Sequence, residues 1–536
     1  MRLWTFSTVL LAASMFIGCG SDQTFNDQPT AGGTDSSDAG AEASNDAHAD
    51  SPAEANTNQD APSDSPHHCD TSALPWVDSC VIDEHIAIFV SPLGDNDLDC
   101  GTRQHPCSTI DTGLRSARDF HKKRLYICAD KGDYAENVVV TGALDGLEVY
   151  GGFKCDDWSY DTSGSLKAKV VGAADQPAWK VEGLTKGMTL WNLDISAQDA
   201  SKPSGSSIAM WIVDSSGVQL HQCDVKAGKG AHGKHGNGGS KGDDGQIPGK
   251  FQKGQDAACG TNIPTITTGG GWSQASACGS KGGHGAMGSI NQTGAPGDDG
   301  TPTDHVLDPD AGKGGTGTQV IGENGHDGIP GSAGKPGARG AAAAPGKLTK
   351  AGYVPGDGNP GAEGFPGQGG GGGGSSASNV GNGTPCVGAA GGAGGMGGCG
   401  GKGGYPGKGG GASIALLVWD SAVVLEACDI EAADAGNGGN GGKGGPGGLG
   451  VKGGDGGDGD GMVARGGDGG KGGDGGPGGV GSGGSGGDSW AIAFHGNKPQ
   501  GSPTVKHANA GNPGKDGDGN VSAHDGSAED WHVISD

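Results

Sequence analysis

The residues of this chain that could do chemistry are aspartates and histidines that stand in pairs. Enzymes that cleave glycans need carboxylates that converge on one bond, together with a group that moves the proton. The nearest candidates are Asp156-Asp157, Asp243-Asp244 and His495-Gly496. None of these pairs is repeated along the chain, and the sequence suggests no Ser-His-Asp or Cys-His arrangement. We therefore predict no catalytic residue.

Five aspartates have spacings that resemble calcium-binding sequences: Asp95, Asp97, Asp99, Asp455 and Asp458. Calcium loops continue with a glycine and a closing glutamate, but here the glycine comes late, at Gly101, and no glutamate closes the loop. The second group lies in GGDGGDGD, where Asp460 occupies a position that should be apolar. His232 and His235 could also bind a metal, although isolated solvated histidines are commoner. We predict no cofactor, with calcium at these aspartates as the alternative.

The elements that would position such residues are repeats. The segment Ile208–Val225, IAMWIVDSSGVQLHQCDV, recurs as Ile414–Ile430, IALLVWDSAVVLEACDI. A partial copy is Met188–Ile195, and another begins at Ser489–Phe494. Apolar residues alternate over short runs, which is typical of half-buried strands. A repeat that cannot bury its apolar face alone must stack on neighbouring copies of the same repeat. We therefore predict an all-β chain whose repeats are coils of a parallel β-helix.

Aligning the two long copies sets a register for that stack. Five residues of the first copy match five of the second in order: Val218, Leu220, Cys223, Asp224 and Val225 match Val423, Leu425, Cys428, Asp429 and Ile430. Asp214 likewise matches Asp420. Each repeated aspartate falls at a corner, where aspartate commonly satisfies turn backbone. We predict a turn role for these aspartates rather than catalysis.

Two glycine-rich segments, 226–412 and 431–488, leave the repeats at the same place, directly after CDV or CDI. Glycine recurs every third residue in GHDGIPGSAGKPGARG, and two glycines alternate with one charged residue or proline in GGDGGKGGDGGPGG. Both patterns fit an extended helix with three residues per turn. Two alternatives remain open. The segments are disordered, as composition predicts, or they pack side by side with Lys and Asp facing outward.

Composition limits the size of the core and the choice of partner. The chain has 536 residues, of which 120 are Gly and 27 are Pro, and only 32% are hydrophobic. That is too little apolar surface for several compact cores but enough for one slender stacked core. The net charge of -27 would repel phosphates and argues against a nucleic-acid partner.

The first residues are typical of an export signal. Met1–Gly18 carries one basic residue and then an apolar run too short to span a bilayer. The run ends in Phe16-Ile17-Gly18-Cys19, which resembles the lipobox of bacterial lipoproteins, although leucine is usual where Phe16 stands. We predict lipidation of Cys19; the alternative is an ordinary secretory signal. Residues 19–66 have almost nothing apolar and predict a disordered acidic tether.

Removing Cys19 from the 13 cysteines leaves an even number, which in an exported protein indicates disulfides. Proximity suggests five pairs: Cys69–Cys80, Cys100–Cys107, Cys128–Cys155, Cys259–Cys278 and Cys386–Cys399. Stacked coils would bring Cys223 and Cys428 within the Cα separation of a disulfide. The alternative for these two is a pair of buried free thiols in a core ladder.

The region from Cys69 to Phe153 has more ordinary elements. We expect strands at Ile86–Val90, Arg124–Ala129, Asn137–Val140 and Leu147–Tyr150, with a turn-rich loop at SPLGDNDLDCGT. Ser108 and Asp111 resemble a capping box. A helix of about three turns should follow, with Ile110, Leu114 and Ala117 on one face.

Residues 90–153 are similar to the opening of pectate-lyase-like right-handed β-helix domains of bacterial surface lipoproteins. The shared motifs are S-P-x-G, G-T-x-x-x-P, T-I, G-x-Y-x-E and Y-G-G, and their residues here are Ser91, Pro92, Gly94, Gly101, Thr102, Pro106, Thr109, Ile110, Gly132, Tyr134, Glu136, Tyr150, Gly151 and Gly152. The resemblance implies that the helix caps the open edge of a right-handed solenoid. It identifies architecture far better than chemistry.

Together these patterns predict seven segments: a signal peptide (1–18), a tether (19–66), a cap with the first coils (69–225), a glycine-rich insertion (226–412), one coil (413–430), a second insertion (431–488) and a terminal coil with the C-terminal segment (489–536). We expect a lipid-anchored, non-enzymatic protein of the outer membrane or cell surface, with a structural, adhesive or interaction role. Its partners would be the membrane, through the lipid, and a glycan or protein ligand. The alternative function is a polysaccharide lyase or glycoside hydrolase on the same fold.

Overall fold

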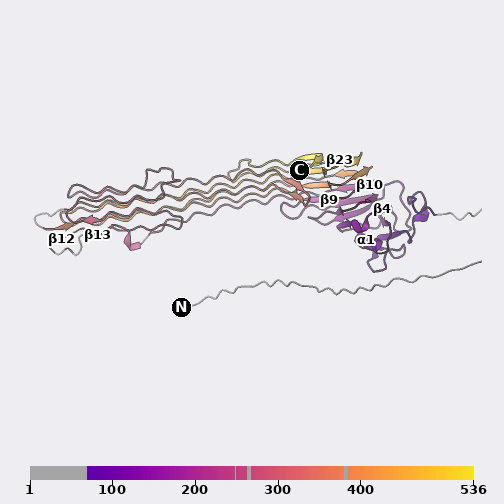
Figure 1. The fold of residues 1–536 in the computed structure, drawn as a ribbon, viewed down its shortest axis with the longest axis horizontal. Helices are drawn as coiled ribbons and strands as arrows, with labels where there is room; N and C mark the ends of the chain where they lie inside the picture. The colour runs from indigo at the N-terminus through magenta and orange to yellow at the C-terminus, as the bar shows by residue number, and fades with distance from the viewer. Residues whose placement is uncertain (1–68, 248, 262, 264–266, 379–383, 536) are drawn as a thin grey trace, which may run out of the picture. The chain divides into compact units, whose positions relative to one another are not determined.

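The computed structural model describes residues 69–535 except 248, 262, 264–266 and 379–383 (Figure 1). These residues belong to one compact unit, His68–Asp536. The predicted signal peptide, the lipidation site Cys19 and the tether lie outside the described residues.

The chain is mostly β, and most of its strands lie in three open parallel sheets. In sheet order, sheet A consists of β1 (Ala87–Asp95), β2 (Arg124–Cys128), β4 (Leu147–Phe153), β7 (Met188–Trp191), β10 (Val218–His221), β19 (Val423–Glu426) and β22 (Gln500–Gly501). Sheet B consists of β5 (Ala168–Gly172), β8 (Leu193–Ala197), β11 (Asp224–Lys226), β20 (Asp429–Glu431) and β23 (Thr504–Lys506). Sheet C consists of β3 (Val138–Thr141), β6 (Trp179–Glu182), β9 (Ser207–Val213), β18 (Ser413–Trp419), β21 (Ser489–His495) and β24 (Ala528–Val533).

From β4 onward the chain visits sheets A, B and C in rotation, so each sheet gains one strand per round. Among the residues that the structure describes, the smaller elements are three two-stranded antiparallel pairs, one α-helix and three short 3-10 helices. They are β12 (Ala258–Cys259) with β17 (Cys386–Val387), β13 (Thr267–Thr268) with β14 (Gly288–Ser289), β15 (Lys347–Thr349) with β16 (Gly352–Val354), α1 (Ile110–Asp119), η1 (Ser79–Val81), η2 (Gly142–Leu144) and η3 (Gly249–Phe251).

The register predicted from the repeats is confirmed. Val218 pairs with Val423 and Asp224 with Asp429, while Ser489–His495 continues the same alignment beyond β18. Inward side chains therefore stack in ladders, as in Leu125, Val149, Leu190, Leu220 and Leu425 of sheet A, all fully buried. Burying such a side chain contributes about 1.5–3 kcal/mol, so a narrow core holds the sheets together.

The expected helix is present, but its cap lies one residue later than the capping-box pattern indicated. Thr109, not Ser108, is the N-cap residue, and its hydroxyl accepts from Thr112 N. Ile110, Leu114 and Ala117 are buried against the core as predicted. The carboxylate of Glu136 accepts from Ile110 N (2.7 Å) and Asp111 N (2.9 Å), satisfying helix amides that have no partner within the helix.

Strand β1 is longer than expected, because Ser91–Asp95 belong to it rather than to the predicted loop. The expected strands at 124–129, 137–140 and 147–150 correspond to β2, β3 and β4. The disulfide Cys100–Cys107 and the bridges from Cys107 to Val90 and Asp95 hold the following turn against β1.

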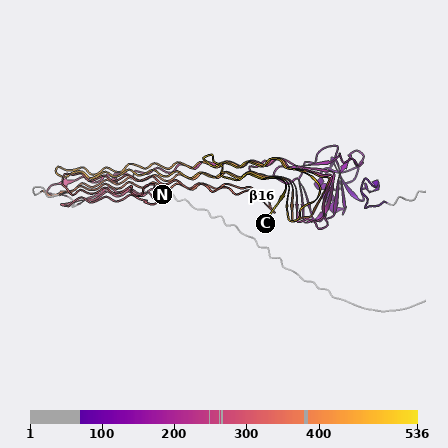
Figure 2. The same cartoon turned by 90° about the horizontal axis from the view of Figure 1, so that it is seen from above.

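The glycine-rich segments are ordered and pack side by side, which answers the alternative that composition left open. Figures 1 and 2 show them running in parallel rows away from the three sheets. Every third amide of 230–245 donates to every third carbonyl of 434–449, from Gly230 N to Asp434 O (3.0 Å) through Gly245 N to Leu449 O (2.8 Å). The same period joins 392–410 to 467–485. We call this set of hydrogen-bonded segments the glycine bundle; its period is that of an extended helix with three residues per turn.

Close approach of backbones is the reason for glycine in this bundle. A Cβ on Gly394 would lie 1.8 Å from Gly370 O, well inside contact distance. The bundle is also fastened to sheet C by the β15–β16 hairpin, whose Leu348 and Tyr353 pack with Ile208, Leu417 and Trp490. Backbone hydrogen bonds and this apolar seam thus join the bundle to the sheets.

Candidate functional site

The aspartate-rich turn after β1 brings together a set of possible metal ligands. Asp95, Asp97 and His105 each offer one ligand atom, and these atoms lie within 4.8 Å of one another. They form the one such group of three or more found among the described residues. Asp99 lies at the rim, 4.0 Å from His105 Nδ1. The sequence does not predict His105 as a member of this group, because only the disulfide Cys100–Cys107 and the return of the chain to β1 bring it close to Asp95.

Within this turn the side chains are engaged with each other. His105 Nε2 lies 2.8 Å from Asp95 Oδ1, a contact that raises the pKa of His105 and, together with Asp97 N, lowers the pKa of Asp95. Two carboxylates and an imidazole supply only part of the six to eight ligands that calcium takes. In the structure these side chains form a carboxylate–imidazole hydrogen bond in the turn after β1.

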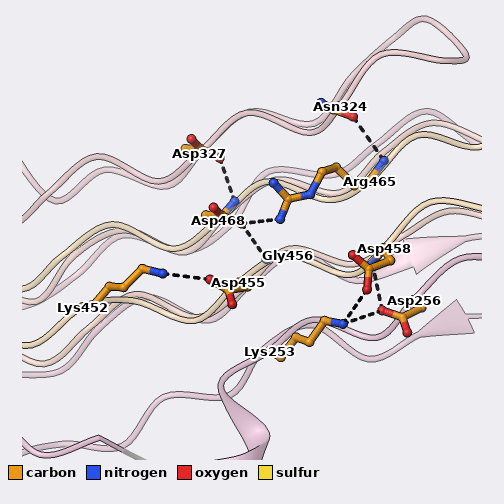
Figure 3. A network of polar contacts seen from close by, with 10 residues as sticks. All are labelled: Lys253, Asp256, Asn324, Asp327, Lys452, Asp455, Gly456, Asp458, Arg465 and Asp468. Atoms are coloured by element: carbon orange, nitrogen blue, oxygen red, sulfur yellow. Dashed lines mark hydrogen bonds and ion pairs between the residues drawn. The ribbon is translucent and has the colours of Figure 1, made fainter.

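The other calcium candidates, Asp455 and Asp458, face different partners (Figure 3). Asp455 pairs with Lys452 (3.0 Å), whereas Asp458 pairs with Lys253 (2.8 Å) and its amide donates to Asp256 Oδ1 (2.8 Å). These carboxylates join segments of the bundle and do not converge on one point.

Side chains at the third position of the glycine repeats accept hydrogen bonds from the backbone of neighbouring segments, a role that the sequence did not predict. Asp434, Asn437 and Asn440 accept hydrogen bonds through their side chains from the amides of Asn509, Asn512 and Lys515 (3.2, 2.8 and 2.9 Å). Asp468 accepts from Gly456 N (2.9 Å) and from Arg465 (2.8 Å) in the same way (Figure 3). The spacing of three between Asp434, Asn437 and Asn440 was the available signal.

The histidines of the first insertion take part in the same pattern. Asn437 N donates to His232 Nδ1 and Asn440 N donates to His235 Nδ1, both at 2.8 Å. Each ring nitrogen thus closes a contact between neighbouring segments. The two histidines act as structural acceptors here.

Two of the four repeated aspartates lie at bends directly after a strand. Asp214 and Asp420 both have a left-handed backbone, with φ of 46°, and their carboxylates contact Lys350 (2.7 Å) and His495 (2.7 Å). The prediction of a turn role was wrong for Asp224 and Asp429, because they begin strands β11 and β20 and pair with each other in sheet B. The carboxylate of Asp224 contacts Lys167 at 2.5 Å.

The adjacent aspartate pairs are likewise engaged separately. Asp156 pairs with Lys131 (2.8 Å), and Asp157 accepts from Ser159 N and Ser159 Oγ. Asp244 contacts Lys241 (2.6 Å) and Leu449 N (2.7 Å). None of these contacts brings the two members of a pair onto a shared partner.

Three disulfides have the partners that proximity suggests: Cys69–Cys80, Cys100–Cys107 and Cys128–Cys155. The other two pairings were wrong, since the structure joins Cys259 to Cys386 and Cys278 to Cys399. The physical reason is packing between distant segments, because β12 and β17 pair antiparallel with Cys259 opposite Cys386. Each of these bonds spans more than 120 residues.

The proposed Cys223–Cys428 disulfide is not formed; both residues are buried free thiols on the two repeats that pair in sheets A and B. Each sulfur contacts main-chain carbonyls, Cys223 Sγ with His221 O and Cys428 Sγ with Leu220 O, both at 3.3 Å. Burial raises the pKa of the Cys223 thiol. The pair is therefore the core ladder that the sequence left as the alternative.

One buried carboxyl lies beside a cavity at the last strands. Asp488 is 6% exposed and accepts from Ser527 N (2.6 Å) and Ser527 Oγ (3.2 Å), and its burial raises its pKa. Trp490 Nε1 donates to the same Ser527 Oγ (2.8 Å), and His532 stacks on Trp490. The group ties β21 to β24 and was not singled out from the sequence.

No protein-family model, curated protein or solved structure matches the chain in the comparisons made with it. Over residues 69–535, apart from the gaps given above, no helix is long and apolar enough to cross a membrane. The five disulfides are consistent with an exported protein.

Proposed function

We propose that this chain is an exported, lipid-anchored interaction protein of the bacterial surface, without catalytic activity. In this proposal, Cys19 carries the lipid and residues 19–66 are the tether. The three parallel sheets are the faces of a right-handed β-helix, with α1 as its cap. The rotation of the chain through sheets A, B and C supports the coil interpretation.

The observation that carries the interaction role is the glycine bundle. Its segments are joined by repeated backbone hydrogen bonds rather than left as free loops, and its outward charges form ion pairs such as Lys402–Glu363 and Lys408–Asp357, both 2.8 Å. An ordered, hydrated surface built from so few apolar residues suits display and contact. The engagement of the recurring aspartates in turns and ion pairs supports a non-enzymatic role.

Two measurements test this proposal in the native host. Metabolic labelling with a fatty acid should mark the parent protein in the membrane fraction, and Cys19→Ala should abolish the label and release the protein. Incubation with a panel of acidic and neutral glycans should yield no shorter products. Loss of labelling at Cys19 without change in location would overturn the anchor, and reproducible glycan cleavage would overturn the non-enzymatic role.

A further inference from the structure

Residues 509–517, which we call the bound segment, add one more segment to the glycine bundle. They are hydrogen-bonded to two neighbouring segments, 434–457 and 466–487. Carbonyls of the bound segment accept from every third amide of the first neighbour, and its amides donate to every third carbonyl of the second. The bonds, all between 2.8 and 3.1 Å, are Ala435 N to Asn509 O, Gly438 N to Asn512 O, Gly441 N to Lys515 O, Gly511 N to Gly487 O, Gly514 N to Gly484 O and Gly517 N to Gly481 O.

The two neighbouring segments keep the same geometry beyond the bound segment. They stay joined to each other, since Gly478 N donates to Gly445 O (2.8 Å). A Cβ on Gly441, beside the bound segment, would lie 2.0 Å from Gly481 O. A Cβ on Gly444, one repeat further along, would lie 1.8 Å from Gly478 O. The surface that holds the bound segment is therefore repeated where no segment lies on it.

Four main-chain groups of this repeated surface have no partner. Gly444 N and Gly447 N donate to no atom of the residues that the structure describes. Gly478 O and Gly475 O likewise accept from none of those residues. All four glycines are half-buried, whereas Gly481, next to the bound segment, is buried. We call these two amides and two carbonyls the glycine ladder; such groups are normally hydrogen-bonded once a second backbone covers them.

Two aspartates show that the amides in this row take an acceptor where one is offered. Asp474 Oδ1 accepts from Gly450 N (2.9 Å). Asp468 Oδ1 accepts from Gly456 N (2.9 Å; Figure 3). These carboxylates act as the carbonyls of the bound segment do three to five repeats earlier, and they set one end of the glycine ladder.

The other end of the glycine ladder is set by a turn at 516–520. Asp516 Oδ1 accepts from Asp518 N and Asn520 N, both at 2.9 Å, and Gly519 has a left-handed backbone with φ of 92°. An ion pair from Asp516 to Arg339 (2.8 Å) fixes the turn to the bundle. The bound segment therefore does not continue along the ladder.

The bound segment also shows which polypeptide fits this surface. A Cβ on Gly511 would lie 1.9 Å from Gly436 O, and a Cβ on Gly514 would lie 2.0 Å from Gly439 O. Every third residue of a segment in this position must therefore be glycine. Pro513 stands between these two glycines, and proline favours the same extended conformation.

We propose that the glycine ladder binds a glycine-rich polypeptide of a partner protein, extended with three residues per turn and with glycine at every third residue. Carbonyls of the partner accept from Gly444 N and Gly447 N. Its amides donate to Gly478 O and Gly475 O, which continues the hydrogen bonding of the bound segment. A β-strand does not match, because the side chains of a strand repeat every two residues.

The sequence favours a different protein as the occupant. Residues 1–68 contain no stretch with glycine at every third position. The periodic glycines of a second copy of this chain would already be packed in its own bundle, as they are here. The inference rests on the proposed function, because it names the kind of partner of that interaction protein.

The test is hydrogen exchange of the full chain with and without a peptide of four Gly-Asn-Pro repeats, which copies residues 511–513. We expect the peptide to slow exchange at short labelling times in fragments covering 441–449, because Gly444 N and Gly447 N become hydrogen-bonded. A matched peptide of four Ala-Asn-Pro repeats should give no protection, since its methyl groups would meet the backbone carbonyls of the bundle.

One substitution should strengthen the binding of the glycine peptide. Asn437 and Asn440 accept through their side chains from amides of the bound segment (2.8 and 2.9 Å), and Lys443 has the next position in this row. Lys443→Asn offers one more acceptor, and we expect it to tighten binding about two- to tenfold. The control is Lys123→Asn, the same substitution at an exposed lysine directly before β2, which should leave the affinity unchanged.

Protection of 441–449 by the glycine peptide and not by the alanine peptide, with tighter binding to Lys443→Asn than to the control, supports the inference. Equal protection by both peptides, no protection at millimolar glycine peptide, or equal affinities of the two variants overturns it. Protection of 441–449 that grows with protein concentration, together with a dimer in sedimentation, also overturns it, because the ladder would then bind a second copy.

Failure of this inference can be told apart from failure of the proposed function. Glycan cleavage, or unchanged location without the Cys19 label, would refute the proposed function and leave binding of the glycine peptide standing. Absent peptide binding, with the label present and no glycan cleaved, would refute only this inference.

Discussion

The adjacent residues Gly238 and Gly239 give a matched test of the glycine bundle. A Cβ on Gly239 would lie 2.0 Å from Lys402 O, whereas a Cβ on Gly238 would lie in ordinary contact, 3.5 Å from Lys443 O. Both residues belong to the same segment, and the same side chain is added. Only the distance to the neighbouring backbone differs.

The expected cost follows from that distance. Ordinary contact begins at about 3.4 Å, so Gly239→Ala requires the segments to separate by about 1.4 Å. If this separation lengthens the hydrogen bond from Lys402 N to Ser240 O, which is now 3.0 Å, that bond breaks. Its loss costs about 1–3 kcal/mol of stability. Overpacking by the added methyl group costs about 1–3 kcal/mol more. Alanine also lowers the conformational entropy of the unfolded chain, which offsets about 0.4–1 kcal/mol of the loss. We expect Gly239→Ala to destabilise the local structure by about 1–6 kcal/mol and Gly238→Ala to stabilise it slightly.

Hydrogen exchange measured by mass spectrometry checks this expectation on peptides covering 231–247 and 399–410. A local cost of about 2 kcal/mol should speed exchange by about thirtyfold or more if opening is local, and Tyr405 N, which donates to Asn237 O at 2.9 Å, should report it. The peptides of sheets A to C serve as an internal reference. Equal protection in both variants, or equal loss in both, would refute the argument that close backbone approach requires glycine here.

Three further predictions concern the cysteines and acid stability. Non-reducing peptide mapping should recover the two long-range disulfides Cys259–Cys386 and Cys278–Cys399. Recovery of a Cys259–Cys278 disulfide would contradict the pairing of β12 with β17. Cys223 and Cys428 should resist iodoacetamide in the folded protein and react after denaturation, because they are buried and the pKa of Cys223 is raised; rapid labelling in native buffer would argue against the ladder. Hydrogen bonds from Ser163 and Leu166 N lower the pKa of Asp161 to about 2, so its ionised form stabilises the fold above the unfolded pKa, and this stability is lost as pH falls from about 4 to about 2. Asp161→Asn should therefore cost on the order of 1 kcal/mol near neutral pH and nothing below pH 2, and a pH-independent difference in urea unfolding would contradict it.

The helix and the register of the repeats could be predicted from the sequence because they depend on local patterns. Alternation with period two decides which residues face inward, and a slip of one residue would expose them all. The order of Val218, Leu220 and Asp224 in one copy and Val423, Leu425 and Asp429 in the other therefore determined the pairing that the structure has. The N-cap residue of the helix was harder to predict. Asn96, which lies outside the helix, accepts hydrogen bonds from both Ser108 N and Thr109 N, and no local pattern shows this contact.

The candidate sites depended on long-range contacts and were accessible only in part. Asp95 and Asp97 were found through their spacing, but His105 joins them only because a disulfide and β bridges return the chain.

The sequence by itself determined that the chain builds strands from repeated segments, that the repeats align residue by residue, and that glycine recurs with a period of three. Only the tertiary structure decided that the glycine-rich segments are ordered, because their stability comes from hydrogen bonds between residues as far as 75 and 205 positions apart. It also decided which cysteines meet, since the partners of Cys259 and Cys278 lie on segments brought together by packing. The glycine content shows that backbones can approach each other closely. The hydrogen bonds that stabilise such packing form only when a second segment lies alongside the first.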